Sequence, residues 1–548
     1  RFVNLIADSD QDSADSDPSN DEKLNSKVLV GLSTIKNVDR SMRERRMILH
    51  QHLNVIIQKI LNFIDLSQAN TNPWSIAAQL ASCRGLISRA VKYKFIDSIL
   101  KCTTVETPSS GVPKIAVDRI VASAARDKQV RSADYTGAVQ NSVFGQAFRQ
   151  LWSHHPSKLK PPRQPGSRPH ISFDVKFKGE HAQGEGGLYR AFFTDIGREL
   201  HEILGDDGEA IYTLPLFIQC PNKQSLLGEN RDKFIPRPSS TGNLHLTLYE
   251  FVGRLIGIAT RTGIFMKCDF PSLFWKPLVG VGLTQKDLEN IDKSFSHGVL
   301  QRLREYTNDD EKSFKSDFGD TLTYSVHLSD KSFVQLRNGG ESMPVVFEDR
   351  ILFAEQALKI RLNESQRQLK AIKQGFTSLI PEELLCLCTW EDLERKVCGK
   401  PTIDIGLLRR HTVYGGVDPN APHIRFFWQV LTEFTQDERR KFIKFSWAQE
   451  RLPSNDEDFV HPGQQIRLLI KTRQMKDGEN PDDAFPRADT CFFNFELPPY
   501  SSLEATRSKL TTVINLDAGM DGDVDVDIGD EFGVISDDED DEDSSLSS

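Results

Sequence analysis

The sequence predicts an α+β protein with more than one folded unit. Its first part carries apolar residues at the three- and four-residue spacing of helices, whereas short β-type runs alternate with helical stretches from about residue 170 onward. The chain has 548 residues, which is more than one hydrophobic core usually supports. We therefore expect a largely globular chain with two or more domains, or with one bilobal catalytic unit and additional segments.

Acidic residues collect at the two ends of the chain. Residues 8–22, DSDQDSADSDPSNDE, are acidic and rich in Ser, so an acidic disordered segment is predicted over residues 1–22. Residues 517–548 hold 14 Asp and Glu but no Lys or Arg, and predict an acidic disordered tail that aids solubility or binds a basic partner. The formal net charge is −10, yet outside this tail 68 basic residues face 64 acidic ones (78 − 14), a balance of +4.

The charge pattern and the lack of long apolar runs argue against two classes of function. No basic stripe is interleaved with aromatic residues, so no nucleic-acid partner is expected. No stretch approaches eighteen consecutive apolar residues, and the N-terminus lacks the pattern of a signal peptide, so neither membrane insertion nor secretion is expected. Because the first residue is Arg1 rather than Met, we expect a piece of a longer protein.

Residues 23–165 are predicted to form a helical region. Apolar residues at helical spacing indicate a long amphipathic helix that ends at Asn72 and Pro73; they are Met47, Ile48, Leu53, Ile56, Ile57, Ile60, Leu61 and Ile64. Further helical stretches cover residues 74–100 and 142–152, with a polar loop between them. We interpret the region as an adaptor that packs against the main domain, with an independent ligand-binding domain as the alternative.

The pattern changes after the Pro-rich segment 161–169. Residues 171–177 and 212–218 have the alternation and composition of strands, and helical stretches lie between such runs from there on. The main domain is therefore predicted to start near His170 and to continue to about Asn515.

The eight cysteines lack the spacing of a disulfide framework, which favours reduced thiols and a place in the cytoplasm or nucleus. Cys386, Cys388 and Cys398 form a cluster, but it lacks a nearby His and the paired CxxC spacing of zinc modules. We predict that these three side chains are buried small hydrophobic groups. No metal is expected.

The segment FPRADTCFFNFELPPYSS, residues 485–502, carries the most chemical information. Apolar residues that partly alternate after Cys491 predict a strand pinned into a small core, with the cysteine on a turn at the start of the strand. A thiolate is a strong nucleophile, and its thioester stays reactive toward amines, so an exposed Cys491 suits acyl carriage. The alternative for a cysteine judged by residue type alone is a buried, inert side chain.

This segment resembles the C-terminal lobe of HECT ubiquitin ligases, with the pattern Leu-Pro-x-x-x-Thr-Cys, an aromatic, Leu-Pro and Tyr-x-Ser. The matching residues are Pro486, Thr490, Cys491, Leu497, Pro498, Tyr500 and Ser502. Further segments resemble the family in the same order along the chain; they are residues 175–193, 251–265, 337–339, 374–385, 398–416 and 426–453. Trp447 and the stretch SVFGQAFRQL are similar to the large HERC-like branch.

The resemblance implies a bilobal HECT domain. It places a mainly helical larger N-lobe at residues 170–400, a hinge region at 401–412 and a small α/β C-lobe at 413–516. Gly399, Pro401 and Gly406 are the predicted hinge residues. A ubiquitin-conjugating enzyme is expected to dock on the smaller N-lobe subdomain, around residues 283–330, with Leu303 and Tyr306 as its apolar contacts.

The same resemblance implies a ubiquitin-protein ligase that takes ubiquitin from the conjugating enzyme as a thioester on Cys491 and passes it to substrate lysines. Thr490 and Asp489 are predicted supporting residues, and Asp489 is a candidate to receive the proton of the attacking lysine. No cofactor is required, because the energy of the thioester is supplied upstream. The expected partners are the conjugating enzyme, ubiquitin and protein substrates.

Three departures from the family pattern keep an alternative open, namely a catalytically inactive HECT-like scaffold that binds ubiquitin or the conjugating enzyme. Gly184 replaces an acidic residue of the opening pattern, Ala448 replaces a Gly that follows an aromatic, and Asp489 stands where His is frequent. A cysteine protease is the other rival. It would need His411, His423 or His461 as a base, and none of them lies in a protease motif.

Overall fold

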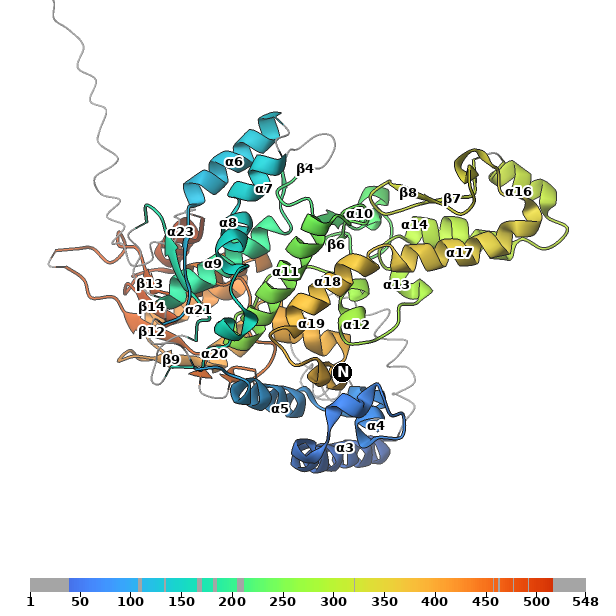
Figure 1. Cartoon of the computed structure of the whole chain (residues 1–548). Coiled ribbons are helices and arrows are strands. Elements are labelled where there is room, and N and C mark those ends of the chain that lie inside the picture. Colours follow the sequence, from blue (N-terminus) through green and yellow to red (C-terminus); the bar gives the residue numbers. More distant parts are fainter. Residues whose placement is uncertain are drawn as a thin grey trace, which may run out of the picture.

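The structure is a computed structural model, and it describes residues 39–515 except 107–110, 133–134, 165–169, 181–184, 205–210, 320, 457, 462–463, 477 and 491 (Figure 1). Its buried apolar side chains form two hydrophobic cores. The first runs from Ile57 to Cys398 and the second from Ile403 to Ile514. Helices dominate the first core and a four-stranded sheet lies in the second, so the predicted α+β class is confirmed.

The first helices are shorter than predicted because capping side chains interrupt them. Helix α3 (Arg40–Ile60) is followed by two 3₁₀ turns, the second of which starts where Asp65 accepts a hydrogen bond from the Ser67 amide. The predicted helix over residues 74–100 is divided into α4 (Ile76–Ser82) and α5 (Arg89–Cys102). Ser88 caps α5 by accepting from the Val91 amide, and such local bonds compete with helix continuation.

The prediction of a polar loop between residues 100 and 142 was wrong. That stretch contains strand β1 (Lys114–Val117) and helices α6 (Arg119–Ser132) and α7 (Tyr135–Asn141) before α8 (Val143–Leu151). Strand β1 pairs in parallel with β2 (Asp174–Phe177), which opens the predicted main domain. A four-residue strand is stabilised by its partner rather than by its own sequence. The helical region therefore shares a sheet and a core with the main domain, as the adaptor interpretation requires.

Buried ion pairs fasten α5 to α19 (Trp390–Cys398). The Lys92 ammonium lies 2.5 Å from the Asp392 carboxylate with only 1% of the Lys92 side chain exposed, and Lys396 pairs with Asp97 at 2.5 Å. Tyr93 also donates a hydrogen bond to the backbone carbonyl of Asp392. Helix α19 is the last helix of the first core, so these contacts connect residues 89–102 to the end of that core.

Two glycines allow the central helices of the first core to touch backbone to backbone. A Cβ at Gly253 in α11 (Asn243–Thr262) would lie 2.0 Å from the Ile372 carbonyl oxygen. One at Gly375 in α18 (Gln366–Thr377) would lie 1.8 Å from the Glu250 carbonyl oxygen. No side chain fits there, since packed interiors leave no such room. Around this pair lie α9 (Glu185–Glu199), α12 (Ser272–Leu278) and α19.

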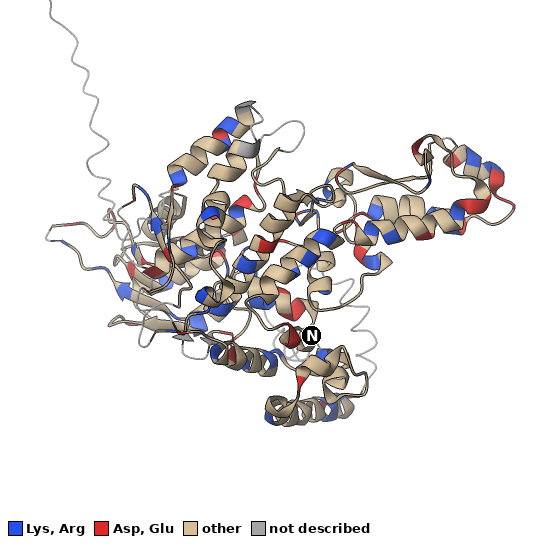
Figure 2. Cartoon of the chain, viewed as in Figure 1, with Lys and Arg blue, Asp and Glu red and all other residues tan. Residues whose placement is uncertain are grey.

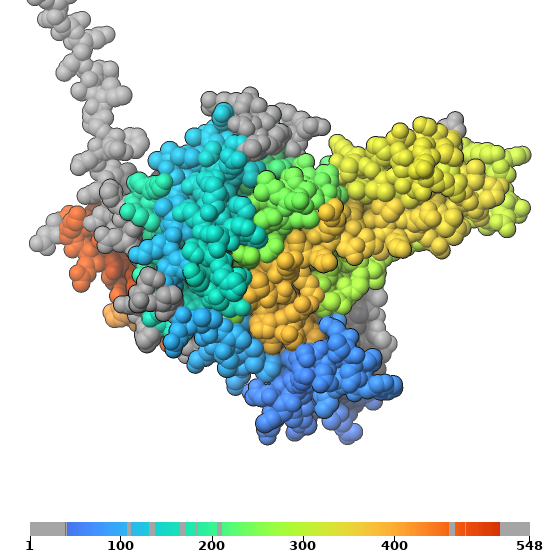
Figure 3. All heavy atoms as spheres, viewed as in Figure 1, coloured from blue at the N-terminus to red at the C-terminus, as the bar shows by residue number. Residues whose placement is uncertain are grey.

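Residues 285–363 form a projecting unit at one end of the molecule (Figures 1 and 3). Its elements are α13 (Gln285–Glu289), α14 (Lys293–Phe295), a π-helical turn (Ser296–Gln301), α15 (Arg302–Glu305), α16 (Glu311–Asp317), β7 (Ser325–His327), β8 (Phe333–Gln335) and α17 (Arg350–Asn363). The two strands form an antiparallel hairpin. Short strands β3 (Ile203–Leu204), β4 (Ile211–Tyr212), β5 (Phe217–Gln219) and β6 (Phe234–Pro236), with helix α10 (Pro221–Ser225), lie between α9 and α11.

The second core is built on the sheet β13-β14-β12-β9, at the opposite end of the molecule in Figure 1. Its strands are β9 (Thr412–Tyr414), β12 (Leu468–Thr472), β13 (Arg487–Asp489) and β14 (Asn494–Leu497). Its helices are α20 (Ile405–Arg410), α21 (Pro422–Glu433), α22 (Gln436–Trp447) and α23 (Leu503–Asn515). A separate pair of short strands is formed by β10 (Val460–His461) and β11 (Gln464–Gln465). The strand predicted after Cys491 is confirmed as β14. The antiparallel partner β13 was not anticipated.

Charged residues of both signs are spread over the described elements (Figure 2). Figure 2 shows Lys and Arg interspersed with Asp and Glu over the described elements, without a basic stripe in this view. Within the described part of the chain, no helix is long and apolar enough to cross a membrane. Cys386, Cys388 and Cys398 are buried, which confirms that they are core residues.

We predict that Lys92→Met lowers the free energy of unfolding by about 3 kcal/mol, because it removes the nearest cation of the buried Asp392 carboxylate and leaves only Arg89, which lies 3.8 Å away. Lys315→Met is the matched control, since its partner Glu311 lies on the surface and such pairs contribute less than about 1 kcal/mol. Denaturant unfolding measures both variants. Equal losses in the two would show that residues 89–102 do not fold as part of the first core.

Candidate active site

The four residues 490–493 connect β13 to β14 at the edge of the second core. Residue Cys491 lies outside the described residues, and its neighbours define the surroundings of the predicted nucleophile. Asp489 and Thr490 are half-buried, and Phe492 is exposed. The Asp489 carbonyl accepts from the Phe492 amide at 3.3 Å, and its carboxylate accepts from the Asn494 amide group at 3.5 Å. Of the two predicted supporting residues, Thr490 thus lies in the connection and Asp489 ends the strand before it.

Phe493 holds this connection in a strained backbone conformation. Its φ of 57° lies in the left-handed region, which a bulky side chain rarely adopts. The ring is buried and stacks on Trp447 with centroids 4.8 Å apart, and the Phe493 carbonyl accepts from the Leu469 amide of β12. Packing and sheet pairing offset a strain of order 1–3 kcal/mol. Such strain is frequent at functional sites, and no feature of the sequence had pointed to Phe493.

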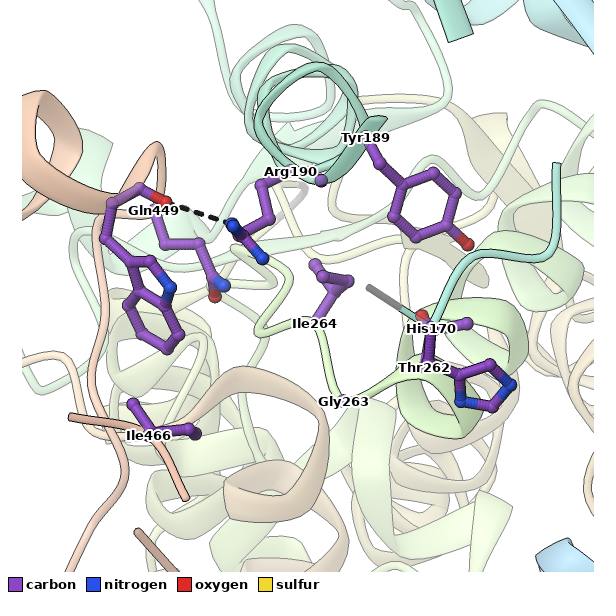
Figure 4. A pocket seen from close by; sticks show the side chains of 10 residues that line it. His170, Tyr189, Arg190, Thr262, Gly263, Ile264, Gln449 and Ile466 are labelled. Carbon is purple, nitrogen blue, oxygen red and sulfur yellow. Dashed lines mark hydrogen bonds between the residues drawn. The ribbon is translucent and has the colours of Figure 1, made fainter. Parts of the chain in front are cut away.

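Arg190 of α9 reaches this connection from the first core. Its Nη2 donates to the Thr490 carbonyl at 2.6 Å and its Nε donates to the Trp447 carbonyl at 3.1 Å, the bond drawn in Figure 4. Only 5% of Arg190 is exposed. Both acceptors are backbone groups of the second core, so a buried cation of one core fixes two main-chain positions of the other. No local pattern in the sequence singled out Arg190, because these partners lie 257 and 300 residues away.

Ala448, one of the departures from the family pattern, occupies a conformation that favours glycine. It ends α22 with φ 57° and ψ 24°, and its carbonyl accepts from the Thr194 hydroxyl of α9 at 3.0 Å. A left-handed alanine costs about 1 kcal/mol relative to glycine. The backbone therefore keeps the shape that a glycine would give, and the substitution changes stability rather than the path of the chain.

The joint between the two cores passes through Gly399. Its φ of 65° and ψ of −161° lie in a region that is nearly exclusive to glycine. A Cβ there would lie 2.8 Å from the Leu452 carbonyl oxygen and 3.0 Å from the Phe265 ring, while the next residue, Lys400, donates its amide to the same Leu452 carbonyl. This geometry explains why a glycine stands at the predicted hinge.

The other two predicted hinge residues differ from Gly399. Pro401 is exposed and lies in the short connection, whereas Gly406 lies in the first turn of α20. Asp404 caps that helix by accepting from the Leu407 amide, and Ile403 is already part of the second core. Of the predicted hinge region 401–412, only the residues before Ile403 lie between the two cores, because α20 packs with the second core.

Further contacts cross between the cores beside the joint. Arg451 forms an ion pair with Asp269, and the Gln449 side chain accepts from the Phe265 amide at 3.2 Å. Burial acts to raise the pKa of Asp269, but the charge of Arg451 and other nearby cations lowers it below the ordinary value. Burial also lowers the pKa of His201 to about 4. The neutral imidazole donates from Nδ1 to the Gly197 carbonyl and accepts the Asp269 amide at Nε2.

A pocket lies beside Arg190 where the two cores meet (Figure 4). The first core contributes Tyr189, Arg190 and Ile264 to its lining, and the second contributes Trp447, Gln449 and Ile466. Among the described residues, no group of three or more His, Cys, Asp or Glu is placed to hold a metal ion.

Of the three histidines of the protease alternative, His411 has hydrogen-bonding and stacking partners, whereas the Nε2 of His423 is buried without a hydrogen-bond partner among the described residues. His411 lies 2.8 Å from the Asp456 carboxylate and stacks on Phe459 with centroids 4.1 Å apart. His423 lies in the first turn of α21, where burial lowers its pKa. His461 belongs to β10, and its side chain lies outside the described residues. The contacts of His411 and His423 give no support to a protease.

Most of the other thiols are unsuited to nucleophilic chemistry. Burial raises the pKa of Cys386 to about 11 and that of Cys388 to about 12, and it raises the pKa values of Cys220 and Cys268 as well. Within the described residues, Cys102 is exposed and Cys83 half-buried.

Leu303 is a correction to the predicted docking contacts, since 0% of it is exposed and it belongs to the first core. Tyr306 is half-buried, donates its hydroxyl to Asp317 and packs against Phe314 and Phe318. The exposed apolar side chains of the projecting unit lie further along the chain; they are Phe333, Val334, Met343, Val346, Ile351 and Leu352. Leu303 follows helical spacing in the sequence, and only the packing of α15 shows which way it faces.

The chain belongs to the HECT-domain (ubiquitin-transferase) family, because the model of that family matches residues 213–522, more than half of the chain. It is 29% identical over 512 residues to the E3 ubiquitin-protein ligase HERC2 of Homo sapiens, which covers 93% of this chain and 10% of HERC2. It is 30% identical over 517 residues to the probable E3 ubiquitin-protein ligase HECTD4 of Homo sapiens, covering 88% of this chain and 12% of the relative.

The E3 ubiquitin-protein ligase HUWE1 of Mus musculus is 28% identical over 394 residues, which cover 71% of this chain and 8% of the relative. The chain thus spans about a tenth of the length of these relatives. The predicted resemblance to HECT ligases, including the HERC-like branch, is confirmed by these matches.

We predict that Gly399→Ala lowers the free energy of unfolding by about 3 kcal/mol, because the new methyl group meets the Leu452 carbonyl in a backbone conformation reserved for glycine. Gly416→Ala is the control. It also has a positive φ, of 75°, but open space around it, so its cost should be about 1 kcal/mol. Thermal or denaturant unfolding compares the two, and similar losses would mean that the contact at the joint is not tight.

Proposed function

We propose that this chain is the catalytic part of a ubiquitin-protein ligase that carries ubiquitin on Cys491. In the first step the Cys491 thiolate attacks the thioester carbonyl of a charged conjugating enzyme, a new thioester forms and the donor thiolate leaves. In the second step a substrate lysine amine attacks the Cys491 thioester, an isopeptide bond forms and Cys491 leaves as a thiolate. Both steps are acyl transfers, so they need neither oxidant nor metal.

The observation that carries the proposal is the position of the Thr490 peptide. In this chain of the HECT-domain family, Thr490 directly precedes the predicted nucleophile. Its carbonyl accepts a hydrogen bond from Arg190 of the first core, whereas the connection 490–493 itself belongs to the second core. A thiol on a strained connection at the junction of two cores suits a group that must meet a donor and later an acceptor. Asp489 lies two residues away and is our candidate to receive the lysine proton.

The two hydrophobic cores correspond, in this proposal, to the N-lobe and the C-lobe of the family. The joint at Gly399 and the residues up to Ile403 then form the hinge about which the lobes change their relative orientation. Our predicted boundaries of the domains stand as part of this proposal, with the hinge shortened as described.

We infer that the conjugating enzyme docks on the exposed apolar side chains of the projecting unit. Phe333 is 47% exposed and Val346 is 51% exposed, and exposed apolar groups gathered on a protruding unit are typical of a protein interface. Tyr306 remains a predicted contact. The further partners in the proposal are ubiquitin and protein substrates, and the proposed place of action is the cytoplasm or nucleus.

The alternative function is a HECT-like scaffold that binds ubiquitin or the conjugating enzyme without transfer. The departures at Gly184, Ala448 and Asp489 favour it. At Ala448 the backbone nevertheless adopts the conformation expected of glycine, so this departure gives the scaffold function little support.

The test is a pulse-chase with activating enzyme, a panel of conjugating enzymes and labelled ubiquitin, analysed on non-reducing gels. The unchanged chain should form an adduct that reductant removes, and Cys491→Ala should form none, because the thioester needs the thiol. Cys102→Ala is the matched control, since Cys102 is an exposed thiol elsewhere, and it should behave as the unchanged chain. A folded chain that forms no adduct with any conjugating enzyme would favour the scaffold.

Phe333→Glu should lower the rate of adduct formation at least tenfold at limiting conjugating enzyme, because a buried charge opposes an apolar interface. Leu244→Glu is the control, since Leu244 is 65% exposed at the start of α11 and should leave the rate unchanged. Titration of the charged conjugating enzyme separates docking from chemistry. An unaltered Phe333→Glu rate at every concentration would place the docking surface elsewhere.

A further inference from the structure

Arg190 forms a cross-link of a particular kind between the two cores. The carbonyls of Trp447 and Thr490, to which it donates, are neutral backbone groups of the second core. A nearly buried guanidinium depends strongly on such acceptors, because hydrogen bonds made by charged groups are stronger than neutral ones and a buried donor without a partner is costly. Separation of the cores at this point would therefore be opposed.

The two acceptors are also joined to one another. The Trp447 ring stacks on Phe493, which follows residue 491 by two positions, and the Trp447 carbonyl ends helix α22, where the helix dipole adds negative charge. Thr194, one turn further along α9, donates to the next carbonyl, that of Ala448. One face of α9 thus holds the end of α22 and the connection 490–493 together.

The bonds of Arg190 and Thr194 come from α9, whereas the bond from Lys400 to Leu452 lies at the joint itself. Lys400 directly follows Gly399, and its amide donates a hydrogen bond to the Leu452 carbonyl. Because this hydrogen bond lies at the joint, it can persist while the two cores rotate about the joint. The bonds of Arg190 and Thr194 join α9 to the end of α22 and to the connection 490–493, and they must break in a large rotation, as must the contacts of Gln449 and Arg451. Arg190 is therefore placed to set the balance between two orientations of the cores.

The arrangement seen here keeps the connection 490–493 away from the projecting unit. In Figures 1 and 3 the strands β13 and β14 lie at one end of the molecule and the projecting unit lies at the other. If that unit binds the charged conjugating enzyme, as our proposed function holds, the thiol at position 491 has to approach it before transfer. The contacts of Arg190 stabilise the arrangement in which it has not done so.

We infer that Arg190 is a latch, a positioning residue that holds the second core turned away from the docked conjugating enzyme and must release the Trp447 and Thr490 carbonyls before Cys491 is loaded. This inference rests on the proposed function. Loading then proceeds from a minor population, and its rate is reduced by the fraction of molecules in which the latch is open.

The test compares Arg190→Met, which cannot donate, with Arg190→Lys, which keeps the charge but not the fork of donors. Arg198→Met is the matched control, since Arg198 lies on the same helix and pairs with Asp195 and Glu202. Thr194→Val removes a lesser part of the latch. Single-turnover loading from a ubiquitin-charged conjugating enzyme, discharge to free lysine, thermal unfolding and hydrogen exchange of residues 447–452 and 489–493 are measured for each.

Arg190→Met should load about tenfold faster than the unchanged chain, the effect expected for loss of one or two hydrogen bonds to a charged group. Exchange at residues 447–452 and 489–493 should increase while exchange at β1 and β2 stays the same. The loading rates of Arg190→Lys and Thr194→Val should lie between those of the unchanged chain and Arg190→Met, and the loading rate of Arg198→Met should equal that of the unchanged chain. A loss of stability alone would not accelerate loading.

Slower or unchanged loading by Arg190→Met with unchanged exchange in both segments would overturn the latch. If Arg190→Met does not fold, the loading rates of Arg190→Lys and Thr194→Val are compared with that of the unchanged chain, and rates no faster than the unchanged chain would overturn the latch. If the unchanged chain forms no thioester, the proposed function fails, and the exchange experiment alone then decides whether Arg190 holds the two segments against α9.

Discussion

The arrangement of this protein depends on the contacts that the short segment Trp447–Leu452 makes with the first core. This segment leaves α22 in a left-handed turn at Ala448 and runs back along the boundary between the two cores. Its carbonyls at Trp447, Ala448 and Leu452 accept hydrogen bonds from Arg190, Thr194 and Lys400. Because backbone groups buried at such a boundary must find partners, the few donors that reach them determine how the cores sit together, and with them where the connection 490–493 lies.

The first core extends well before the match to the HECT-domain family. That match begins at residue 213, whereas strand pairing between β1 and β2 and the ion pairs of α5 with α19 bring residues 89–117 into the same unit. The likeness to HERC2 also covers 93% of the chain. A buried lysine paired with a carboxylate is costly to break, so these helices constrain α19 and, directly after it, the joint at Gly399. The helical region is thus a structural support for the joint.

The sequence predicted those features that local chemistry controls. The three clustered cysteines are buried as expected, and the strand predicted after Cys491 forms as β14, where the alternation places it. Predictions failed where distant partners decide. Strand β1 has four residues and forms by pairing with β2, and Leu303, a predicted docking contact, is buried in the first core. A local effect was missed at Ser88, whose cap starts a new helix where apolar spacing alone would continue the old one.

By itself the sequence determined the family of this protein and its α+β character, and it predicted Cys491 as the nucleophile, because a motif of a few residues is enough to indicate thiol chemistry. Only the tertiary structure decided that Arg190 holds the Thr490 carbonyl, that Phe493 and Ala448 have left-handed backbones, and that the second core begins as early as Ile403, a few residues after Gly399. These features arise between residues hundreds of positions apart. Their energies come from burial and from hydrogen bonds across the two cores, which no local pattern in the chain records.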